Sequence, residues 1–505
     1  RYVEPSYYDA NWDYVGTGPY YVSTVSQPSN LVILEKNTLY WAGWDAPHRG
    51  GSLDRIDIEY IADWAPRRDA FIACELDTCA VPRAYMDELL DPADPAKMKV
   101  LYPEMITIKN IYPGLSLDAT HYTFAIRSGS AYVGTGNLVS GLGIPLNFFN
   151  NTKVRHAFNY AFNRTEYIIE AWKNEASLRE TPGISGLVPD YYTGETLIKD
   201  FKFNEDYAKA KQALKDAVMN STGGTEGTVD SVWNWGFTLT MTYNTGNDQR
   251  MIACNMVRDF FANMSGDAER AGKPAFTISV LPIDWPTYLY NSYMRYNAIW
   301  AVGWLSDYTD ADNWYGAYMH SFICFASWQR WREVLGWTQT STLGLTKDQL
   351  IELAIKTPDG PERAQMYADL DDIFLEVGAS LPVAEPMGRR WCKYWVRGWY
   401  YDGLYPGGYY RNIWKEDTCW ADITGTAEAG IPDGTTNMRD IGYICARFGR
   451  KAPDPTRVPP YDFGWAPGTY GGAGGADVYG DRRIDMRDIG LACAHFLHPT
   501  VAHPE

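Results

Sequence analysis

The residues best suited to binding a ligand lie between positions 284 and 315. An apolar run at 298–302 leads into Gly303 and Trp304, and a cluster of carboxylates that begins with Asp307 follows. We predict a buried strand that delivers Trp304 and Asp307 to a cleft, because open α/β sheets bind ligands at the carboxyl ends of their strands. A desolvated carboxylate can select a cation there through charge-assisted hydrogen bonds, with the indole ring as an apolar wall.

Two further side chains are candidate ligand contacts. Trp314 lies in the same segment, and Arg295 is the arginine nearest to the apolar run. The run itself carries no arginine, so a partner for a ligand carboxylate is not evident, and an oligosaccharide stays open as a ligand class beside a peptide. The alternative for Asp307 is a turn or helix cap, and the alternative for Trp304 is core packing.

Flanking segments predict the lobe that must position these residues. Residues 237–243 alternate polar and apolar side chains as a strand does, and a helix is expected to begin near Asp248. Strands followed by helices indicate an α/β lobe. A further helix over residues 362–377 would gather four apolar side chains on one face: Tyr367, Leu370, Phe374 and Val377.

Composition narrows the classes of function. The 505 residues are 46% hydrophobic and carry a net charge of −17. This balance is typical of a globular protein and argues against a nucleic-acid partner, because no basic run can neutralise phosphates. No apolar run approaches the ~20 residues that span a bilayer. The G-x-S-x-G, H-E-x-x-H and Walker sequences are absent, so we do not expect an enzyme.

Cysteines and sequons suit a secreted protein. An extracellular setting permits disulfides, although inert buried thiols are the alternative. We expect a bridge between Cys74 and Cys79, which would close a short loop, and one between Cys445 and Cys493, which occupy equivalent positions of a repeat. By elimination, the remaining pairs are Cys254–Cys324 and Cys392–Cys419. Four N-x-S/T sequons are candidate glycosylation sites, at Asn150, Asn163, Asn220 and Asn263.

Residues 422–497 contain an internal repeat. The sequence NMRDIG at 437–442 recurs as DMRDIG at 485–490, and a short amphipathic segment follows each copy. In the second copy, carboxylates fall at loop positions 1, 5, 9 and 12: Asp477, Asp481, Asp485 and Asp488. At this spacing several oxygen ligands can converge on a calcium ion, which we predict as the cofactor. The alternative is a degenerate repeat that stabilises the fold without calcium.

The repeat pair resembles a dockerin type I module, which consists of two loop-helix calcium units. The resemblance adds the carbonyl of Arg483 to the second site. It implies a first site made of Asp422, Asp433, the carbonyl of Thr435, Asn437 and Asp440. Tyr479 and Arg482 depart from the family pattern, because position 3 is normally a ligand and position 6 prefers glycine.

The segment at 284–315 resembles the family 5 solute-binding proteins, the receptors of ABC importers for peptides and related solutes. Residues 285–289 match W-P-x-Y-x, and residues 303–314 match G-W-x-x-D-Y-x-D-P-D-N-F. Further motifs occur in the family's order over residues 14–414: G-T-G-P-Y at 16–20, a strand at 31–37, a G-E-I-D type segment at 73–77, V-R-x-A-x-x-Y-A-I-D-R at 153–164, and segments at 361–367 and 395–400.

The resemblance implies a periplasmic-binding-protein-like fold of type II, an α/β fold with two lobes, a hinge and mixed sheets. We expect part of lobe I at 1–130, the large C-terminal α/β lobe at 131–385, and the return to lobe I at 386–415. Residues 416–505 would form a small α-helical loop-helix repeat module with a Gly/Pro-rich linker at 450–476. In the family, G-T-G-P-Y lies well inside the protein, so we expect an N-terminal portion of the fold to be absent from this chain.

The implied function is capture of an extracellular solute, a peptide or an oligosaccharide, for the permease of an ABC importer. In peptide-binding members the carboxylate matching Asp307 pairs with the ligand's α-ammonium group. The alternative is an extracellular structural or assembly subunit, a surface array or filament that reuses the fold. Its partner would be a further copy of the chain or the missing N-terminal portion. In both cases we expect an extracellular, cell-surface protein.

Overall fold

The computed structural model describes residues 17–26, 28–44, 53–102, 105–113, 116–184, 202–336, 341–399, 409–415 and 441. The chain divides into two compact units. Unit 1 comprises residues 1–109, 389–401 and 407–505, and unit 2 comprises residues 110–388 and 402–406. Residues 110–130, which we assigned to lobe I, belong to unit 2 because they include a central strand of its sheet.

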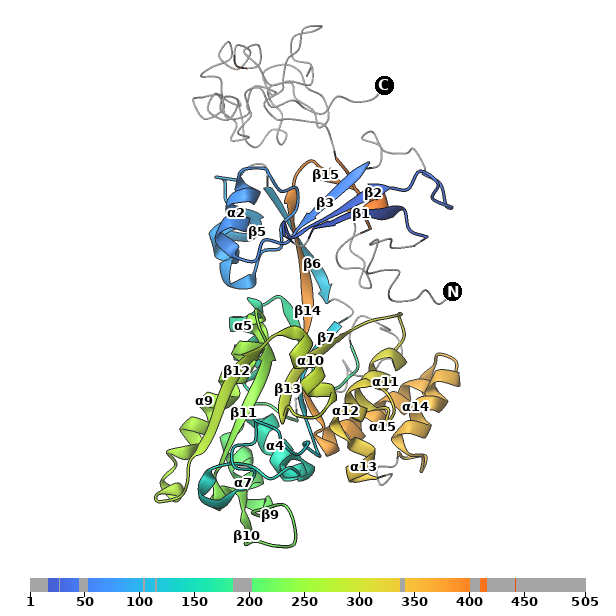
Figure 1. The fold of residues 1–505 in the computed structure, drawn as a ribbon. Helices are drawn as coiled ribbons and strands as arrows, with labels where there is room; N and C mark the ends of the chain where they lie inside the picture. The colour runs from blue at the N-terminus through green and yellow to red at the C-terminus, as the bar shows by residue number, and fades with distance from the viewer. Residues whose placement is uncertain are drawn as a thin grey trace. The chain divides into compact units, whose positions relative to one another are not determined.

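Unit 2 is built around a seven-stranded mixed sheet (Figure 1). The strand order is β12-β11-β13-β7-β14-β6, and β8 pairs with β14. β11 runs parallel to β12 and β13, whereas β7 is antiparallel to β13 and β14. The strands are β6 (Met105–Pro113), β7 (Ser116–Tyr122), β8 (Ala176–Leu178), β11 (Phe237–Asn244), β12 (Phe276–Ile283), β13 (Ile299–Leu305) and β14 (Ser380–Lys393). The predicted α/β lobe with a mixed sheet is confirmed.

Helices cover this sheet. Both helices that the sequence predicted are present. The helix expected near Asp248 is α9 (Asp248–Ser265), and the helix expected at 362–377 is α15 (Pro361–Val377). The four side chains predicted for its apolar face are all buried. The other described helices of unit 2 are α4 (Thr152–Tyr160), α5 (Arg164–Trp172), α7 (Tyr207–Asp216), α8 (Val232–Trp235), α10 (Trp285–Tyr293), α11 (Asp312–Met319), α12 (Cys324–Gln329), α13 (Trp331–Leu335) and α14 (Lys347–Lys356).

The predicted apolar strand is β13, and it lies in the middle of the sheet. Ile299 and Trp300 are fully buried, because β11 and β7 flank the strand and helices cover it. The indole Nε1 of Trp300 donates to Thr123 Oγ1 at 3.0 Å, which satisfies the one polar atom of this ring. The run therefore belongs to the core, and only its carboxyl end reaches the surface.

Unit 1 has a smaller core and an open sheet. Strands β1 (Tyr20–Ser26), β2 (Leu31–Lys36) and β3 (Arg55–Glu59) form an antiparallel sheet in the order β1-β2-β3. A separate core lies around α2 (Trp64–Ile72) and α3 (Met86–Leu89) and includes Trp391. The remaining strands are β4 (Leu90–Asp91), β5 (Asp94–Met98), β15 (Val396–Arg397) and β16 (Trp414–Lys415).

Three of the four predicted disulfides do not form in this structure. Cys79, Cys254, Cys324 and Cys392 are thiols. Cys79 Sγ donates to the neighbouring carbonyl of Ala80, whereas Cys74 Sγ accepts from Lys393 Nζ at 3.2 Å, so the two sulfurs contact different groups. Burial raises the pKa of both Cys254 and Cys324 to about 12, as expected for inert thiols. The bridge between residues 445 and 493 lies outside the described residues and stays a prediction.

Other predicted features are partly outside the described residues. Every predicted calcium ligand lies in the undescribed part of the C-terminal region. Among the sequons, Asn150 and Asn263 are exposed, whereas Asn163 caps α5 by accepting from the backbone N–H of Glu166. Glycosylation itself stays a prediction. No helix among the described residues is both long and apolar enough to cross a membrane.

Asp371 on α15 makes the stability of unit 2 depend on pH. Burial raises the pKa of its carboxyl group from 3.8 to about 7, and Tyr315 Oη donates to it at 2.7 Å. Because the folded-state pKa is the higher one, the folded chain holds a proton that the unfolded chain has lost between about pH 4 and pH 7. This contribution to stability is complete at low pH and is lost as the pH rises through about 7.

We therefore expect Asp371→Asn to stabilise the protein at pH 8 by roughly 1–3 kcal/mol and to have little effect near pH 4. Urea unfolding at both pH values measures the difference. Glu362→Gln, which removes an exposed carboxylate in the first turn of the same helix, is the control and should show no such dependence. An equal effect of Asp371→Asn at both pH values would contradict the assignment.

Candidate functional site

The candidate site lies at one edge of the unit 2 sheet. The parallel strands β12, β11 and β13 all end at this edge, and the antiparallel strand β7 begins there. Two helices also start at the edge, capped by Asn247 and Asp284, whose side chains accept from Arg250 N and Thr287 N. Polar loop residues and the N-termini of two helices are thereby gathered at the place where α/β sheets bind ligands.

Trp304 and Asp307 leave β13 at this edge, as the sequence predicted. One buried side chain holds both of them: Asn313 Oδ1 accepts from Trp304 Nε1 at 2.7 Å and from the backbone N–H of Asp307 at 3.3 Å. The Trp304 ring is partly buried, whereas Asp307 is exposed. The side chain of Asp307 is thus exposed, and its backbone is held by the same amide oxygen that fixes the indole ring.

Exposed apolar side chains also lie at this edge of the sheet. Leu281 near the end of β12 and Trp285 at the start of α10 are 44% and 46% exposed. Leu305 and Tyr308, which flank Asp307, are 49% and 48% exposed. Apolar groups gathered at one edge are typical of a binding surface. The edge therefore offers a carboxylate for a cation and apolar surface for the rest of a ligand.

The structure adds Arg250, which sequence reasoning missed. Arg250 in the first turn of α9 forms an ion pair with Asp118 of β7 at 2.9 Å, and its Nη1 donates to Asn244 Oδ1 at 2.7 Å. Both partners of the ion pair are largely buried. The available signal was its position, seven residues after the end of the predicted strand at 237–243, where the chain turns into a helix.

The neighbouring carboxylates Asp310 and Asp312 hold the loop that follows Asp307. Asp310 Oδ1 pairs with Arg363 Nη2 at 2.5 Å and accepts from the backbone N–H of Asp312 at 3.1 Å. Asp312 Oδ2 accepts from Tyr308 Oη at 2.6 Å, and burial raises the pKa of Asp312. Both carboxylates already have partners, whereas Asp307 is the exposed acidic residue of this loop.

Two predicted ligand contacts are placed elsewhere. Trp314 is fully buried in the core on α11, so its ring cannot touch a solute, and its predicted role is wrong. Arg295 precedes the amino end of β13, whereas Asp307 follows the carboxyl end. Seven strand residues span roughly 20 Å, so Arg295 does not share a site with Asp307. In the described residues, no group of three or more His, Cys, Asp or Glu side chains is arranged to hold a metal.

Comparisons with known proteins agree with this architecture. Residues 3–323, more than half of the chain, match the family described as bacterial extracellular solute-binding proteins, family 5 Middle. The di/tripeptide-binding protein 1 of Pseudomonas aeruginosa (strain UCBPP-PA14) is 21% identical over an alignment of 307 residues, and the match covers 56% of this chain and 50% of that protein. The chain thus spans half the length of this curated relative.

Solved structures share the fold at low sequence identity. One is the ABC transporter-associated periplasmic binding protein DppA from Helicobacter pylori in complex with peptide STSA, with a TM-score of 0.57 at 18% identity. The match covers 82% of this chain and 68% of the DppA chain. OppA from Haemophilus influenzae, in complex with RPPGFSPFR, has a TM-score of 0.56 at 16% identity and covers 81% and 67%. NikA from Staphylococcus aureus, in complex with Ni(L-His)2, has a TM-score of 0.54 at 14% identity and covers 79% and 69%.

These neighbours bind different solutes on one fold, so the likeness establishes the fold and leaves the ligand to the residues of the site. The family consists of binding proteins and not of enzymes, in agreement with the absence of catalytic motifs. A mixed α/β lobe that presents Trp304 and Asp307 at its strand ends, together with the match over residues 3–323, shows that the chain belongs to the bacterial extracellular solute-binding proteins of family 5.

Proposed function

We propose that this protein captures peptides with a free amino terminus outside the cell and delivers them to the permease of an ABC importer. The observation that carries the proposal is the pair formed by exposed Asp307 and half-buried Trp304, both held by Asn313. A carboxylate next to an apolar wall pairs well with an ammonium group once a ligand excludes water. The solved neighbours with bound peptides, DppA and OppA, support the same ligand class.

The carboxyl end of the peptide has a smaller role in this proposal. Arg250 is a cation at the same edge, and Asp118 and Asn244 already occupy its guanidinium group. A ligand carboxylate would have to compete with this largely buried ion pair, whose disruption would leave a charge without its partner. We therefore infer that affinity depends on the amino terminus, and that longer peptides and peptide amides are accepted.

An oligosaccharide is the second candidate, and the exposed aromatic rings favour it. Trp285 and Tyr308 offer flat apolar surfaces at the edge, and sugars stack on such rings. A sugar has no ammonium group, so it would gain no charge-assisted bond from Asp307. Binding of maltotriose or cellotriose with no binding of peptides would favour this candidate.

The affinities of the purified protein for three forms of trialanine test the peptide proposal. We expect free trialanine and its C-terminal amide to bind alike, and N-acetyl-trialanine to bind about ten- to a hundredfold more weakly. This corresponds to the loss of one charge-assisted hydrogen bond. Asp307→Ala should lower the affinity for free trialanine to that of the acetylated form. Glu170→Ala, on an exposed position of α5, is the charge-matched control and should change nothing.

Equal affinity of Asp307→Ala and the unchanged protein for trialanine would remove the amine-pairing role. Isothermal titration calorimetry measures all of these constants directly. Failure of every peptide and sugar to bind the unchanged protein would contradict the solute class itself.

Asn313 should act as a positioning residue for the same ligand. Asn313→Leu removes the acceptor of both Trp304 Nε1 and Asp307 N, so we expect weaker trialanine binding and a shifted tryptophan emission. Asn313→Asp retains an acceptor oxygen and should keep more of the affinity than Asn313→Leu does. If Asn313→Leu lowers stability and leaves affinity intact, the residue serves the fold alone.

We also propose that the C-terminal repeats bind calcium. The support is the sequence spacing of oxygen ligands, led by Asp477, Asp481, Asp485 and Asp488. Titration of the EDTA-treated protein with calcium should release heat and raise the melting temperature, and EDTA should reverse both effects. Asp485→Ala combined with Asp488→Ala should weaken the response. No heat and no shift in melting would remove the proposal.

A further inference from the structure

Three arginines lie at the end of β13 that is remote from Asp307. Arg295 precedes the strand, Arg330 joins α12 to α13, and Arg127 follows β7. All three belong to unit 2, and we call them the arginine cluster. Asp307 leaves the opposite end of β13, so the cluster is separate from the candidate site for an amino terminus.

Backbone hydrogen bonds bring the three segments of the cluster together. Phe124 N donates to the carbonyl oxygen of Gln329 at 3.0 Å, next to Arg330 in the sequence. Arg127 N donates to the carbonyl oxygen of Arg295 at 2.9 Å. The segment 124–127 thus hydrogen-bonds to both of the other segments, and the three arginines start from backbone positions that are held together.

The cluster gathers like charges with little to balance them. Burial and the charges of Arg330 and Arg127 lower the pKa of Arg295, because a low-dielectric setting and neighbouring cations both disfavour its charged form. The carboxylate of Glu333 lies 3.9 Å from Arg330 Nη1 and 3.7 Å from Arg332 Nη2. Charge-assisted hydrogen bonds are about 2.7–2.9 Å long. One carboxylate is therefore shared, at long range, between two guanidinium groups.

Donor groups of the cluster lack acceptors in the described part of the chain. The half-buried side chain of Arg295 forms no hydrogen bond or ion pair there, and Arg330 Nε is buried without an acceptor. The exposed guanidinium group of Arg127 contacts the sulfur of Met294 at 3.6 Å, which is a weak acceptor. Because a buried donor without an acceptor is costly, an oxygen-rich ligand would stabilise this arrangement.

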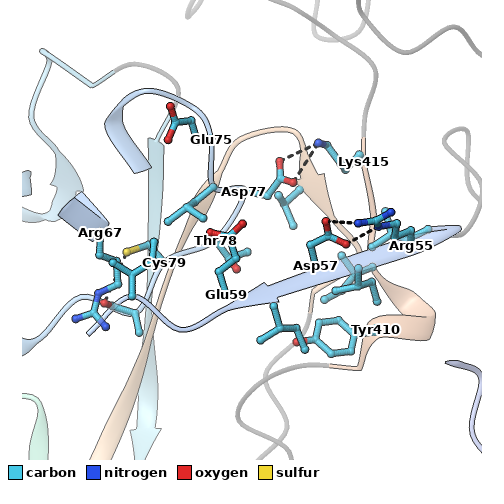
Figure 2. Close-up of a pocket in the computed structure, with 18 of the residues that line it drawn as sticks. Arg55, Asp57, Glu59, Arg67, Glu75, Asp77, Thr78, Cys79, Tyr410 and Lys415 are labelled. Carbon is cyan, nitrogen blue, oxygen red and sulfur yellow. Dashed lines mark hydrogen bonds and ion pairs between the residues drawn. The ribbon is translucent and has the colours of Figure 1, made fainter. Parts of the chain in front are cut away.

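A shortage of carboxylates does not explain the open cluster. The chain has 62 acidic against 45 basic residues. In a pocket of unit 1, of about 820 Å³, the cations are closely paired: Arg55 lies 2.6 Å from Asp57, and Lys415 lies 3.0 Å from Asp77 (Figure 2). The guanidinium groups of the arginine cluster have no such partner at close range. Their unbalanced charge points to an external anion.

Aromatic rings stand beside the cluster. Tyr293 is 59% exposed, and its ring packs edge-on against Trp328 with the centroids 6.1 Å apart. These two residues each precede an arginine of the cluster by two positions, and the guanidinium group of Arg127 lies 5.3 Å from the centroid of the Tyr296 ring. The rings offer apolar surface to the organic part of an anionic ligand.

We propose that the arginine cluster binds the phosphate group of an organic phosphate monoester. Such a group has three terminal oxygens and up to two negative charges, so planar guanidinium groups can donate to it from several directions. A carboxylate has two oxygens and one charge, and it would leave more of the cluster unbalanced. The exposed ring of Tyr293 contacts the organic part. The site needs no peptide and no contribution from Asp307.

Phenyl phosphate and benzoate test the proposal, because they present different anionic groups on the same ring. We expect calorimetry to show one saturable site for phenyl phosphate at pH 8, where the phosphate is largely a dianion. Benzoate should bind at least about tenfold more weakly, because it loses one charge and one acceptor oxygen. Equal affinity for the two probes would overturn the proposal.

Substitutions locate the site. Arg127→Gln and Arg295→Gln should each weaken the binding of phenyl phosphate about tenfold, the loss of one charge-assisted hydrogen bond. Arg258→Gln, which removes an arginine paired with its neighbour Asp259 on α9, is the matched control and should change nothing. Unchanged affinity in both cluster variants would overturn the proposal, as would a loss of phenyl phosphate binding in Asp307→Ala. If Arg295→Gln does not fold, the exposed Arg127 decides.

Vesicles distinguish the two sources of a phosphate monoester, a lipid headgroup and a soluble ester. An equimolar mixture of phosphatidylcholine and phosphatidic acid presents the group at a surface, and pure phosphatidylcholine is the control. Sedimentation of the protein with the mixed vesicles, abolished by Arg127→Gln, would support the proposal and identify a headgroup as the source. Binding of phenyl phosphate alone would support it and identify a soluble ester. Binding of neither would overturn it.

Discussion

The close pairing of β13 with β7 is the constraint on which the candidate site depends. Gly303 lies opposite Asp118, and a Cβ atom at position 303 would lie 2.9 Å from the carbonyl oxygen of Leu117. A side chain at this position would push the strands apart. The absence of a side chain at 303 keeps the end of β13 against β7 and sets the point at which Trp304 leaves the sheet. Arg250 then holds Asp118 from the side of α9, so the same few atoms link two strands and a helix.

Other buried arginines also link separate elements of unit 2. Arg155 is fully buried and donates to the carbonyl oxygens of Val377, Phe149 and Asn150. Arg164 donates to the carbonyl oxygens of Phe203 and Pro382. These guanidinium groups tie loops to helices by satisfying backbone acceptors that burial would otherwise leave unpaired. The sequence motif at 153–164 thus marks a scaffold, whereas the motif at 303–314 reaches the surface only around Asp307.

The parts of the fold that follow from local pattern could be predicted, and the parts that need long-range contacts could not. The composition of the run at 298–302 predicts a strand, and the spacing of apolar residues at 362–377 predicts a helix. Both elements are present. Arg250 was missed because its partner Asp118 is 132 residues away in sequence. Trp314 was misplaced because a helix begins at Asp312 and turns its ring into the core, and proximity in sequence to Trp304 carries no information about that direction.

The two units differ in how their sheets are protected from water. In unit 2 the central strands are buried on both faces, whereas no described residue of β1, β2 or β3 is fully buried. A small sheet gains most of its stability from a covered apolar face. The core of unit 1 lies around α2 and α3, and its clusters of buried residues include none from these three strands. Among the described residues, the sheet of unit 1 therefore gains less from apolar burial than the sheet of unit 2 does, and the two helices of unit 1 supply most of the residues in its main cluster of buried apolar side chains.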